Sequence, residues 1–295
     1  MYKGEIIDAH MHLWDLDHGD YPWLKERNPL IEVLVGDYKK LRQNFLIEDF
    51  LKMVKPHHVT KSIHVEANPS LKKSLHETMW LQKIADTYGF PHGIVVQADL
   101  SDPDLEGVLK DQLQYPNVRG VRQILFHPDD SEKPDLIKEY HWQKGLKLLR
   151  QYELPFELAV FAHQLIDAAK VVREYDDVKF VLEHLGWPVD LSSEGFGMWK
   201  NRLALLAEAP NVYFKISGIG SVLKTADKKT IEPYILAAIQ IFGIDRCFFG
   251  SDFPPGSLFC TYAGLIDSLK RIFETFDEKA QKKLFYDNAK SFYQI

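Results

Sequence analysis

The stretch KFVLEHLGWP, residues Lys179–Pro188, contains the unit from which this chain is built. An apolar run, Phe180–Leu182, ends in the polar pair Glu183 and His184 and then opens into a turn that contains glycine and proline. A segment with helical periodicity follows, as expected for a buried strand that leads into a helix. The same order of strand, polar end and helix recurs along the chain.

Eight such units cover the sequence, with no Ser/Gly linker or shift in composition between them. The predicted strands lie near Glu5–Ala9, Lys61–Glu66, Gly93–Ala98, Val118–Leu125, Pro155–Val160, Lys179–Glu183, Val212–Ile216 and Cys247–Gly250. The predicted helices are Phe45–Val54, Lys72–Tyr88, Asp104–Leu113, His141–Tyr152, His163–Tyr175, Met198–Ala209, Lys228–Phe242 and Thr261–Phe276.

Strands joined by crossover helices pair in parallel, and eight βα units close into a (β/α)8 barrel. A doubly wound sheet, the alternative, usually has fewer strands. We therefore predict one α/β domain over residues 1–295, a (β/α)8 TIM barrel. The stretch 13–43 is long for a βα loop, and we expect it to cover the active-site mouth.

Composition narrows the classes of partner. The chain has 295 residues, of which 45% are hydrophobic and 26% charged, as in ordinary globular proteins. A net charge of -6 favours small molecules over nucleic acid or an anionic membrane. The two cysteines form no metal-type motif, and the N-terminus carries charges where a signal peptide is apolar. We expect a cytoplasmic protein, neither exported nor membrane-spanning, that is a monomer or a small homo-oligomer.

Polar residues at three predicted strand ends suggest a site. His10 and His12 are two apart and therefore point the same way from a strand, where two imidazoles can chelate one divalent cation. His184 closes the sixth strand, and Asp252 follows the eighth, beside prolines. Core histidines and a turn or N-cap aspartate are the plainer readings of each residue alone. Their joint position at carboxyl ends of strands favours a site.

The sequence resembles the lactonase-like amidohydrolase-2 branch of the amidohydrolase superfamily, which includes sugar lactonases and pyrone-dicarboxylate lactonase. The motifs that carry the resemblance span nearly the whole chain in order. They are Ile7–Asp15 with Tyr21–Leu24, Glu77-Thr78 with Trp80-Leu81, Arg119–Arg122, Leu182–Pro188, Lys215–Gly218 and Gly250–Pro254.

The resemblance implies roles for these residues. Asp252 would be the general base that takes a proton from the attacking water, while His184 and a metal ion would polarise the carbonyl group. The expected metal ligands are His10, His12, Asp252 and His184, with Glu157 as an additional ligand or else a salt-bridged strand-end carboxylate. Zinc suits this set. Superfamily members with two metals often place a carbamylated lysine on the fourth strand, and none is present there, so we expect at most one loosely held ion.

Substrate-binding candidates surround these positions. Arg119 and Arg122 face opposite sides of a regular strand, and Arg122, nearer the carboxyl end, is the better candidate for gripping a carboxylate or hydroxyl groups. A structural salt bridge is the alternative for Arg122. Glu66 is expected to bind hydroxyl groups, and Lys215 either binds a substrate oxygen or pairs with Glu157. Among the aromatic residues we expect Trp14 and Trp187 to pack on a sugar ring.

The leading hypothesis is hydrolysis of a lactone, namely a sugar-derived aldonolactone in carbohydrate catabolism. The alternatives are a metal-dependent, non-oxidative decarboxylase of the related aromatic-acid branch and a degenerate barrel that only binds a ligand. The motifs at Tyr21–Leu24 and His184–Pro188 favour the lactonase.

Overall fold

The computed structural model describes residues 1–128 and 131–295. Eight parallel strands follow one another around a single sheet in the order of the sequence. They are β1 (Ile6–Met11), β2 (Val59–Val65), β3 (Gly93–Gln97), β4 (Val118–Ile124), β5 (Phe156–Ala159), β6 (Phe180–Leu182), β7 (Val212–Ile216) and β8 (Cys247–Phe249). The chain after β8 meets the end of β1, because the Asp252 amide donates to the His10 carbonyl at 2.8 Å and the His12 amide to the Phe253 carbonyl at 2.9 Å. The predicted (β/α)8 barrel is confirmed.

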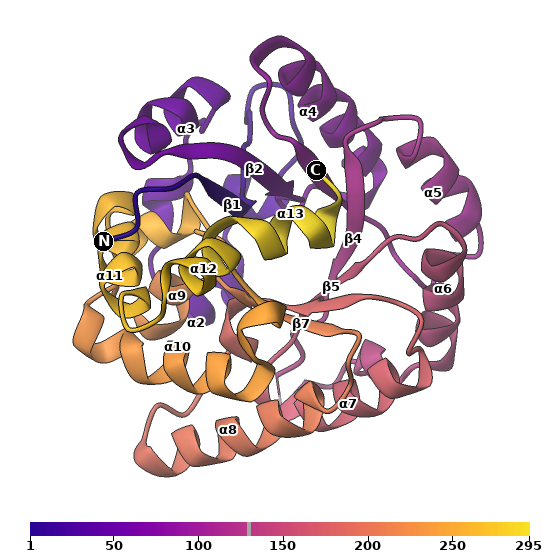
Figure 1. Cartoon of the computed structure of the whole chain (residues 1–295). Coiled ribbons are helices and arrows are strands. Elements are labelled where there is room, and N and C mark those ends of the chain that lie inside the picture. Colours follow the sequence, from indigo (N-terminus) through magenta and orange to yellow (C-terminus); the bar gives the residue numbers. More distant parts are fainter. Residues whose placement is uncertain (129–130) are drawn as a thin grey trace.

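Helices surround the strands (Figure 1). The longer ones are α3 (Ile47–Val54), α4 (Ser74–Tyr88), α5 (Leu105–Gln112), α6 (Tyr140–Gln151), α7 (Leu165–Glu174), α8 (Ser193–Ala207), α10 (Lys228–Phe242) and α11 (Tyr262–Phe273). Each corresponds to a predicted helix. The largest difference between a predicted and an observed helix start is in α8, which begins five residues before the predicted Met198. It does so because Ser192 caps it by accepting the Gly195 amide at 3.1 Å. No helix in the described ranges is long and apolar enough to cross a membrane.

The periodicity of the sequence did not predict five shorter helices. They are α1 (Pro22–Lys25), α2 (Pro29–Val35), α9 (Ile219–Leu223), α12 (Glu278–Lys282) and α13 (Asn288–Tyr293). All five have seven residues or fewer, too few for a repeating apolar face to stand out.

The C-terminal residues close the amino-terminal end of the barrel. The inner face of the strands, including Ile7, Val95 and Phe248, packs on Phe292 and Tyr293. In Figure 1, α13 accordingly lies across the barrel. This end is therefore filled by side chains, which leaves the carboxyl ends of the strands as the open end.

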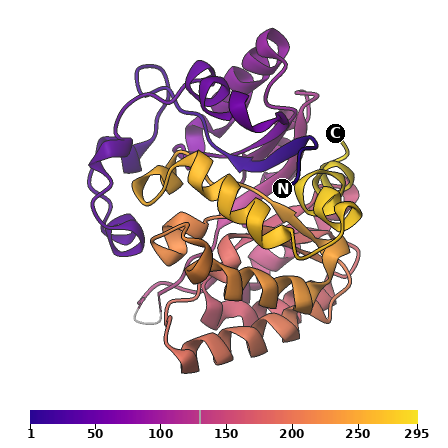
Figure 2. The ribbon, with the colours of Figure 1, turned by 60° about the vertical axis from the view of Figure 1, so that its left-hand side comes forward.

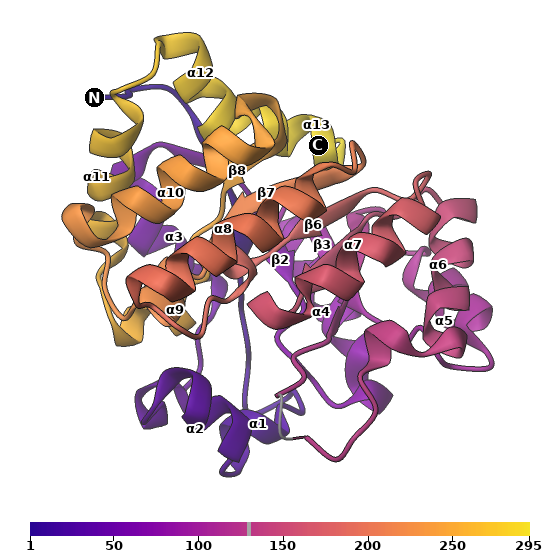
Figure 3. The ribbon, with the colours of Figure 1, turned by 90° about the horizontal axis from the view of Figure 1, so that it is seen from below.

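The segment 13–43 carries α1 and α2 at the opposite end from α12 and α13 (Figures 2 and 3). Its two ends are joined by an antiparallel bridge between Trp14 and Phe45, with both backbone hydrogen bonds at 3.0 Å. Proline at the first position of each short helix and the Asn28 cap on α2 explain why helices form here. The segment is thus an ordered strap, and we use this name for it below.

Candidate active site

A break in the regular pairing of β1 directs two histidines into the barrel. The register against β2 shifts between Asp8 and Met11, which is the mark of a β-bulge. Ala9 packs with the barrel interior and Met11 with the surrounding helices, while His10 and His12 point together into the site. Their Nε2 atoms lie 3.2 Å apart.

Asp252 completes a group of three metal-type ligands. Its Oδ1 lies 3.4 Å from His12 Nε2 and 3.8 Å from His10 Nε2. Its Oδ2 accepts a hydrogen bond from the Ser221 hydroxyl at 3.0 Å. Asp252 has a left-handed backbone (φ 59°), and all three side chains are almost fully buried. Such a conformation costs free energy for a non-glycine residue, and residues of this kind cluster at functional sites.

The hydrogen bonds behind the two imidazoles prepare their Nε2 atoms for a cation. His12 Nδ1 lies 2.8 Å from the Val65 carbonyl oxygen, and His10 Nδ1 lies 3.2 Å from Glu183 Oε1. Each acceptor holds the proton on Nδ1, which leaves both Nε2 lone pairs facing one another, an arrangement typical of metal-binding histidines. Two ligands of a tetrahedral zinc ion lie about 3.3 Å apart, close to the separations seen here. The residues therefore fit one divalent ion.

A second group of potential ligand atoms comes from His10, Glu183 and His184. It shares His10 with the first group, and Glu183 is already paired with Arg122, whose Nη1 donates to Glu183 Oε2 at 3.1 Å. This second group therefore extends the same site and does not supply a separate one.

Buried charges lie directly beneath the histidines. Arg122 donates from Nε to Glu66 Oε1 at 2.6 Å and from Nη2 to the Glu66 carbonyl oxygen at 2.6 Å, besides its pair with Glu183. Lys215 forms an ion pair with Glu157, which also accepts the hydroxyl of Tyr293 in α13. Glu66, Glu157, Lys215 and Glu183 are all 0–1% exposed. Each of these charges is therefore paired with another buried charge of the protein.

This network has more carboxylates than cationic side chains. Burial raises the pKa of Glu157 to about 8, although the Lys215 ammonium acts to lower it. Burial also raises the pKa of Asp252. Glu183 behaves in the opposite way: burial alone would raise its pKa, but Arg122 and His10 hold it well below the ordinary value. A bound divalent cation would supply the missing positive charge, which is a second respect in which the site fits a metal ion.

His184 lies in an unusual turn. His184, Leu185, Gly186 and Trp187 all have positive φ angles, between 38° and 61°, so the turn is left-handed although only one residue is glycine. The Ser217 hydroxyl oxygen accepts the His184 amide at 3.1 Å and lies 3.2 Å from Nδ1. When the hydroxyl donates to Nδ1, the ring proton resides on Nε2. Burial lowers the pKa of His184, so the ring is neutral at pH 7.

A cavity of about 110 Å³ lies above these groups. Six of the predicted site residues line it, namely His12, Trp14, Arg122, His184, Trp187 and Asp252. His10 is fully buried behind this lining, with its Nε2 3.8 Å from Asp252 Oδ1. Glu66, Glu157 and Lys215 lie beneath the wall, in the ion pairs described above. Arg119 lies at the other end of β4, where it bonds to the Pro116 and Val118 carbonyl oxygens.

No role in the site was expected from the sequence for Glu183, Ser217, Ser221 and Tyr293. Glu183 had a usable signal, since it directly precedes His184 at a strand end. Serine is a common residue type, so Ser217 and Ser221 do not stand out in the sequence. Tyr293 contacts Glu157, which is 136 residues away in the chain. No local pattern marks such contacts.

An (β/α)8 barrel with paired histidines on its first strand and an aspartate after its last defines an amidohydrolase-type enzyme. The sequence model of the amidohydrolase family matches residues 7–295, and this chain belongs to that family.

Three proteins show the range of similarity. An uncharacterized protein of Sinorhizobium fredii is 37% identical over 98% of both chains. An L-fucono-1,5-lactonase of Burkholderia ambifaria is 24% identical over 98% of this chain and 95% of its own. A crystal structure of an amidohydrolase from Burkholderia multivorans with bound zinc has a TM-score of 0.84 at 23% identity, covering 99% of this chain and 100% of that one.

A dihydroxybenzoic acid decarboxylase from a Polaromonas species, solved with manganese and an inhibitor, is more distant. Its TM-score is 0.68 at 13% identity, over 100% of this chain and 97% of that one. The two proteins share the fold, but this structure is less similar to the present chain than that of the Burkholderia multivorans amidohydrolase.

Proposed function

We propose that this chain is a metal-dependent hydrolase that opens a lactone ring. The observation that carries the proposal is the convergence of His10, His12 and Asp252 at the carboxyl ends of β1 and β8, with ligand atoms 3.2–3.8 Å apart. The similarity to an L-fucono-1,5-lactonase over nearly the full length supports a lactone as the substrate.

We further propose that the lactone is a neutral, sugar-derived aldonolactone. Among the described residues that line the cavity, Arg122 is the cation that would attract a carboxylate, and its charge is offset by Glu66 and Glu183. A dicarboxylate lactone would gain little from it. Trp14 and Trp187 line the cavity with aromatic surface on which the C–H face of a sugar ring can pack.

His10, His12 and Asp252 would hold the metal ion, and a bound zinc ion lowers the pKa of water and polarises a carbonyl oxygen. Asp252 accepts the proton of the attacking water and later returns it to the alkoxide that leaves as the ring opens. His184 donates from Nε2 to the substrate carbonyl oxygen, where negative charge develops. Glu183, Glu66, Lys215 and Glu157 have a positioning role, because they fix His10 and Arg122 from below.

The decarboxylase alternative receives less support, since the decarboxylase structure is the more distant neighbour. Both cysteines are free thiols, which is consistent with the reducing cytoplasm we propose as the location.

The decisive experiment is a pH-indicator assay over sugar lactones and a pyrone dicarboxylate, with the Asp252→Asn variant as the control. In parallel, carbon dioxide release is measured from dihydroxybenzoates. We expect acid release from at least one sugar lactone and none from the variant. Activity on the pyrone dicarboxylate alone would reject the neutral substrate. Decarboxylation without any lactone hydrolysis would reject the proposed function.

A further inference from the structure

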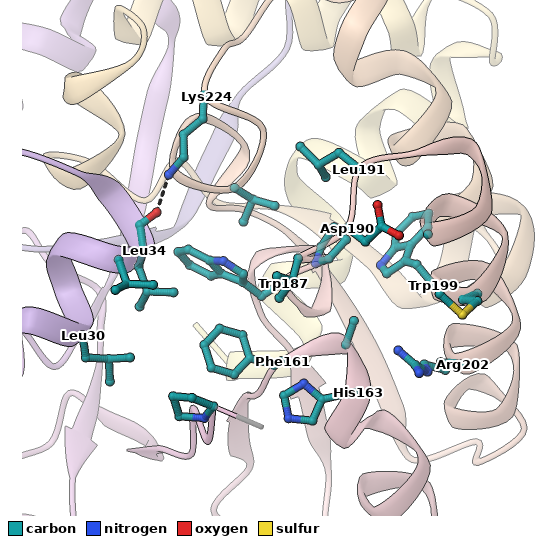
Figure 4. A pocket seen from close by; sticks show the side chains of 18 residues that line it. Leu30, Leu34, Phe161, His163, Trp187, Asp190, Leu191, Trp199, Arg202 and Lys224 are labelled. Atoms are coloured by element: carbon teal, nitrogen blue, oxygen red, sulfur yellow. Dashed lines mark hydrogen bonds between the residues drawn. The ribbon is translucent and has the colours of Figure 1, made fainter. Parts of the chain in front are cut away.

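A second, larger cavity of about 590 Å³ adjoins the catalytic one (Figure 4). Its walls come from α2 of the strap, the turn after β6 and helix α8. Leu34 and Trp187 line both cavities, so these two side chains form the partition between them. A substituent on a substrate in the catalytic cavity would enter this outer cavity by passing Trp187.

Four exposed apolar residues line the outer cavity, beside charged ones such as Asp190 and Arg202. Val33 is 83% exposed, Val189 70%, Leu191 47% and Met198 42%, and all four line it. Single exposed apolar residues are ordinary, but several gathered around a concave surface mark a binding site. Water alone solvates such a surface poorly.

Trp187 provides an independent observation. The indole N–H groups of Trp14, Trp23 and Trp199 donate to the carbonyl oxygens of Gln43, Ala67 and Leu185, at 2.7–2.8 Å. The Trp187 indole N–H makes no such bond within residues 1–128 and 131–295, and it is not one of the buried polar atoms there that lack a partner. It is therefore open to the junction of the two cavities, where a ligand oxygen could accept it.

The strap wall is tied to the catalytic machinery. Lys224 Nζ donates to the Leu34 carbonyl oxygen on α2, and to the Ser221 carbonyl oxygen at 2.7 Å. Ser221 in turn bonds Asp252. The outer cavity is therefore built at a fixed place relative to the reacting centre.

We propose that the outer cavity binds an apolar alkyl or aryl substituent of the lactone, and that the Trp187 indole N–H donates to a substrate oxygen at the junction. This inference rests on the proposed function, which it refines by assigning the substrate an apolar extension. Trp187 then determines specificity, since it separates ring from substituent.

The first test uses δ-lactones of one ring size with alkyl chains of increasing length. Each added methylene that enters the cavity should raise kcat/KM about fourfold, until the cavity is filled. Met198→Asp should abolish this rise and leave the unsubstituted lactone within about twofold. Leu205→Asp is the matched control, because Leu205 lies on the same helix, is 39% exposed and is not among the residues that line the cavity. A flat response to chain length, with hydrolysis intact, would overturn the inference and leave the proposed function standing.

The second test does not depend on turnover. Binding of n-alkanols from butanol to decanol is followed by the tryptophan fluorescence of the protein, to which Trp187 and Trp199 in the cavity lining contribute. We expect affinity to rise with chain length, to be lost in Met198→Asp and to persist in Leu205→Asp. Such binding without hydrolysis of any lactone would reject the proposed function alone. Absence of alkanol binding to the wild-type protein would reject the proposal that the outer cavity binds an apolar group.

Two further measurements separate the remaining explanations. Trp187→Phe keeps an aromatic ring and removes the N–H, so kcat/KM for lactones should fall about tenfold while alkanol affinity stays unchanged. Unchanged kcat/KM would reject the proposed hydrogen bond from the Trp187 indole N–H to the substrate. Sedimentation of wild type and Met198→Asp checks for association: if the substitution splits a dimer, the rim is a contact between copies and the proposal fails.

Discussion

Oδ1 of Asp252 lies 3.4 Å from Nε2 of His12, although 240 residues separate them in the chain. Closure of the barrel produces this contact, because the segment after β8 bonds to the end of β1 through two backbone hydrogen bonds. A carboxylate that faces two imidazoles is thereby held in a buried site.

Asp252→Asn should leave the fold intact and lower kcat for lactone hydrolysis by about 10²–10⁴-fold, since the amide keeps the shape and cannot accept the proton. Circular dichroism and steady-state kinetics measure the two effects. Asp245→Asn, at an exposed ion pair with Lys283, is the control and should retain full activity. If Asp252→Asn kept more than about a tenth of wild-type activity, Asp252 would not be the general base.

His184→Gln should lower kcat by about 10²–10³-fold, as expected when one donor to a developing oxyanion is removed. Ser217→Ala should have a smaller effect, about 10–100-fold, because it removes only the group that orients the ring. Kinetics at saturating substrate compare the two variants. An effect of Ser217→Ala as large as that of His184→Gln would contradict the assigned order of roles.

The protein should bind one equivalent of zinc or less, because the described ligand groups share His10. His10→Gln and His12→Gln should each lower the bound metal strongly, whereas His57→Gln, away from the site, should not. Elemental analysis after dialysis gives the stoichiometry, and a chelator series gives the affinity. Two tightly held equivalents per chain would show that the ligand set is wrong.

Arg122→Met should destabilise the protein by about 3–5 kcal/mol, because it leaves the buried Glu66 and Glu183 without their counter-charge. Arg119→Met, on the same strand but partly exposed and bonded only to carbonyl oxygens, should cost much less. Urea unfolding compares the two free energies. Equal losses of unfolding free energy in the two variants would mean that the ion pairs of Arg122 do not stabilise the protein.

Glu77 makes stability depend on pH. Burial and the nearby Glu66 raise its pKa to about 8, so the folded state favours the protonated form. The resulting stabilisation is complete below about pH 4.5, the unfolded value, and is lost as the pH rises to 8, by at most about 1.4 kcal/mol per unit. Glu77→Gln, which stays neutral, should therefore lose less stability than wild type between pH 5 and 9. Thermal unfolding across this range measures the effect, and Glu208→Gln, at a surface ion pair, should follow wild type.

Much of the architecture was predictable because it is encoded in local patterns. Apolar runs such as Val212–Ile216 recur before helical segments, and this alternation specifies a parallel barrel. The position of His10, His12, His184 and Asp252 at strand ends followed from the same patterns, since carboxyl ends of barrel strands meet at one face.

The sequence by itself therefore determined the class of fold and the identity of the residues near its mouth. Only the tertiary structure decided what those residues contact. The pairing of Arg122 with Glu66 and Glu183, and of Lys215 with Glu157 and Tyr293, joins residues distant in the chain. The left-handed turn at His184–Trp187 and the outer cavity also depend on packing between separate elements. Local periodicity reports which side of a strand or helix is buried, whereas such contacts depend on the register and closure of the whole barrel.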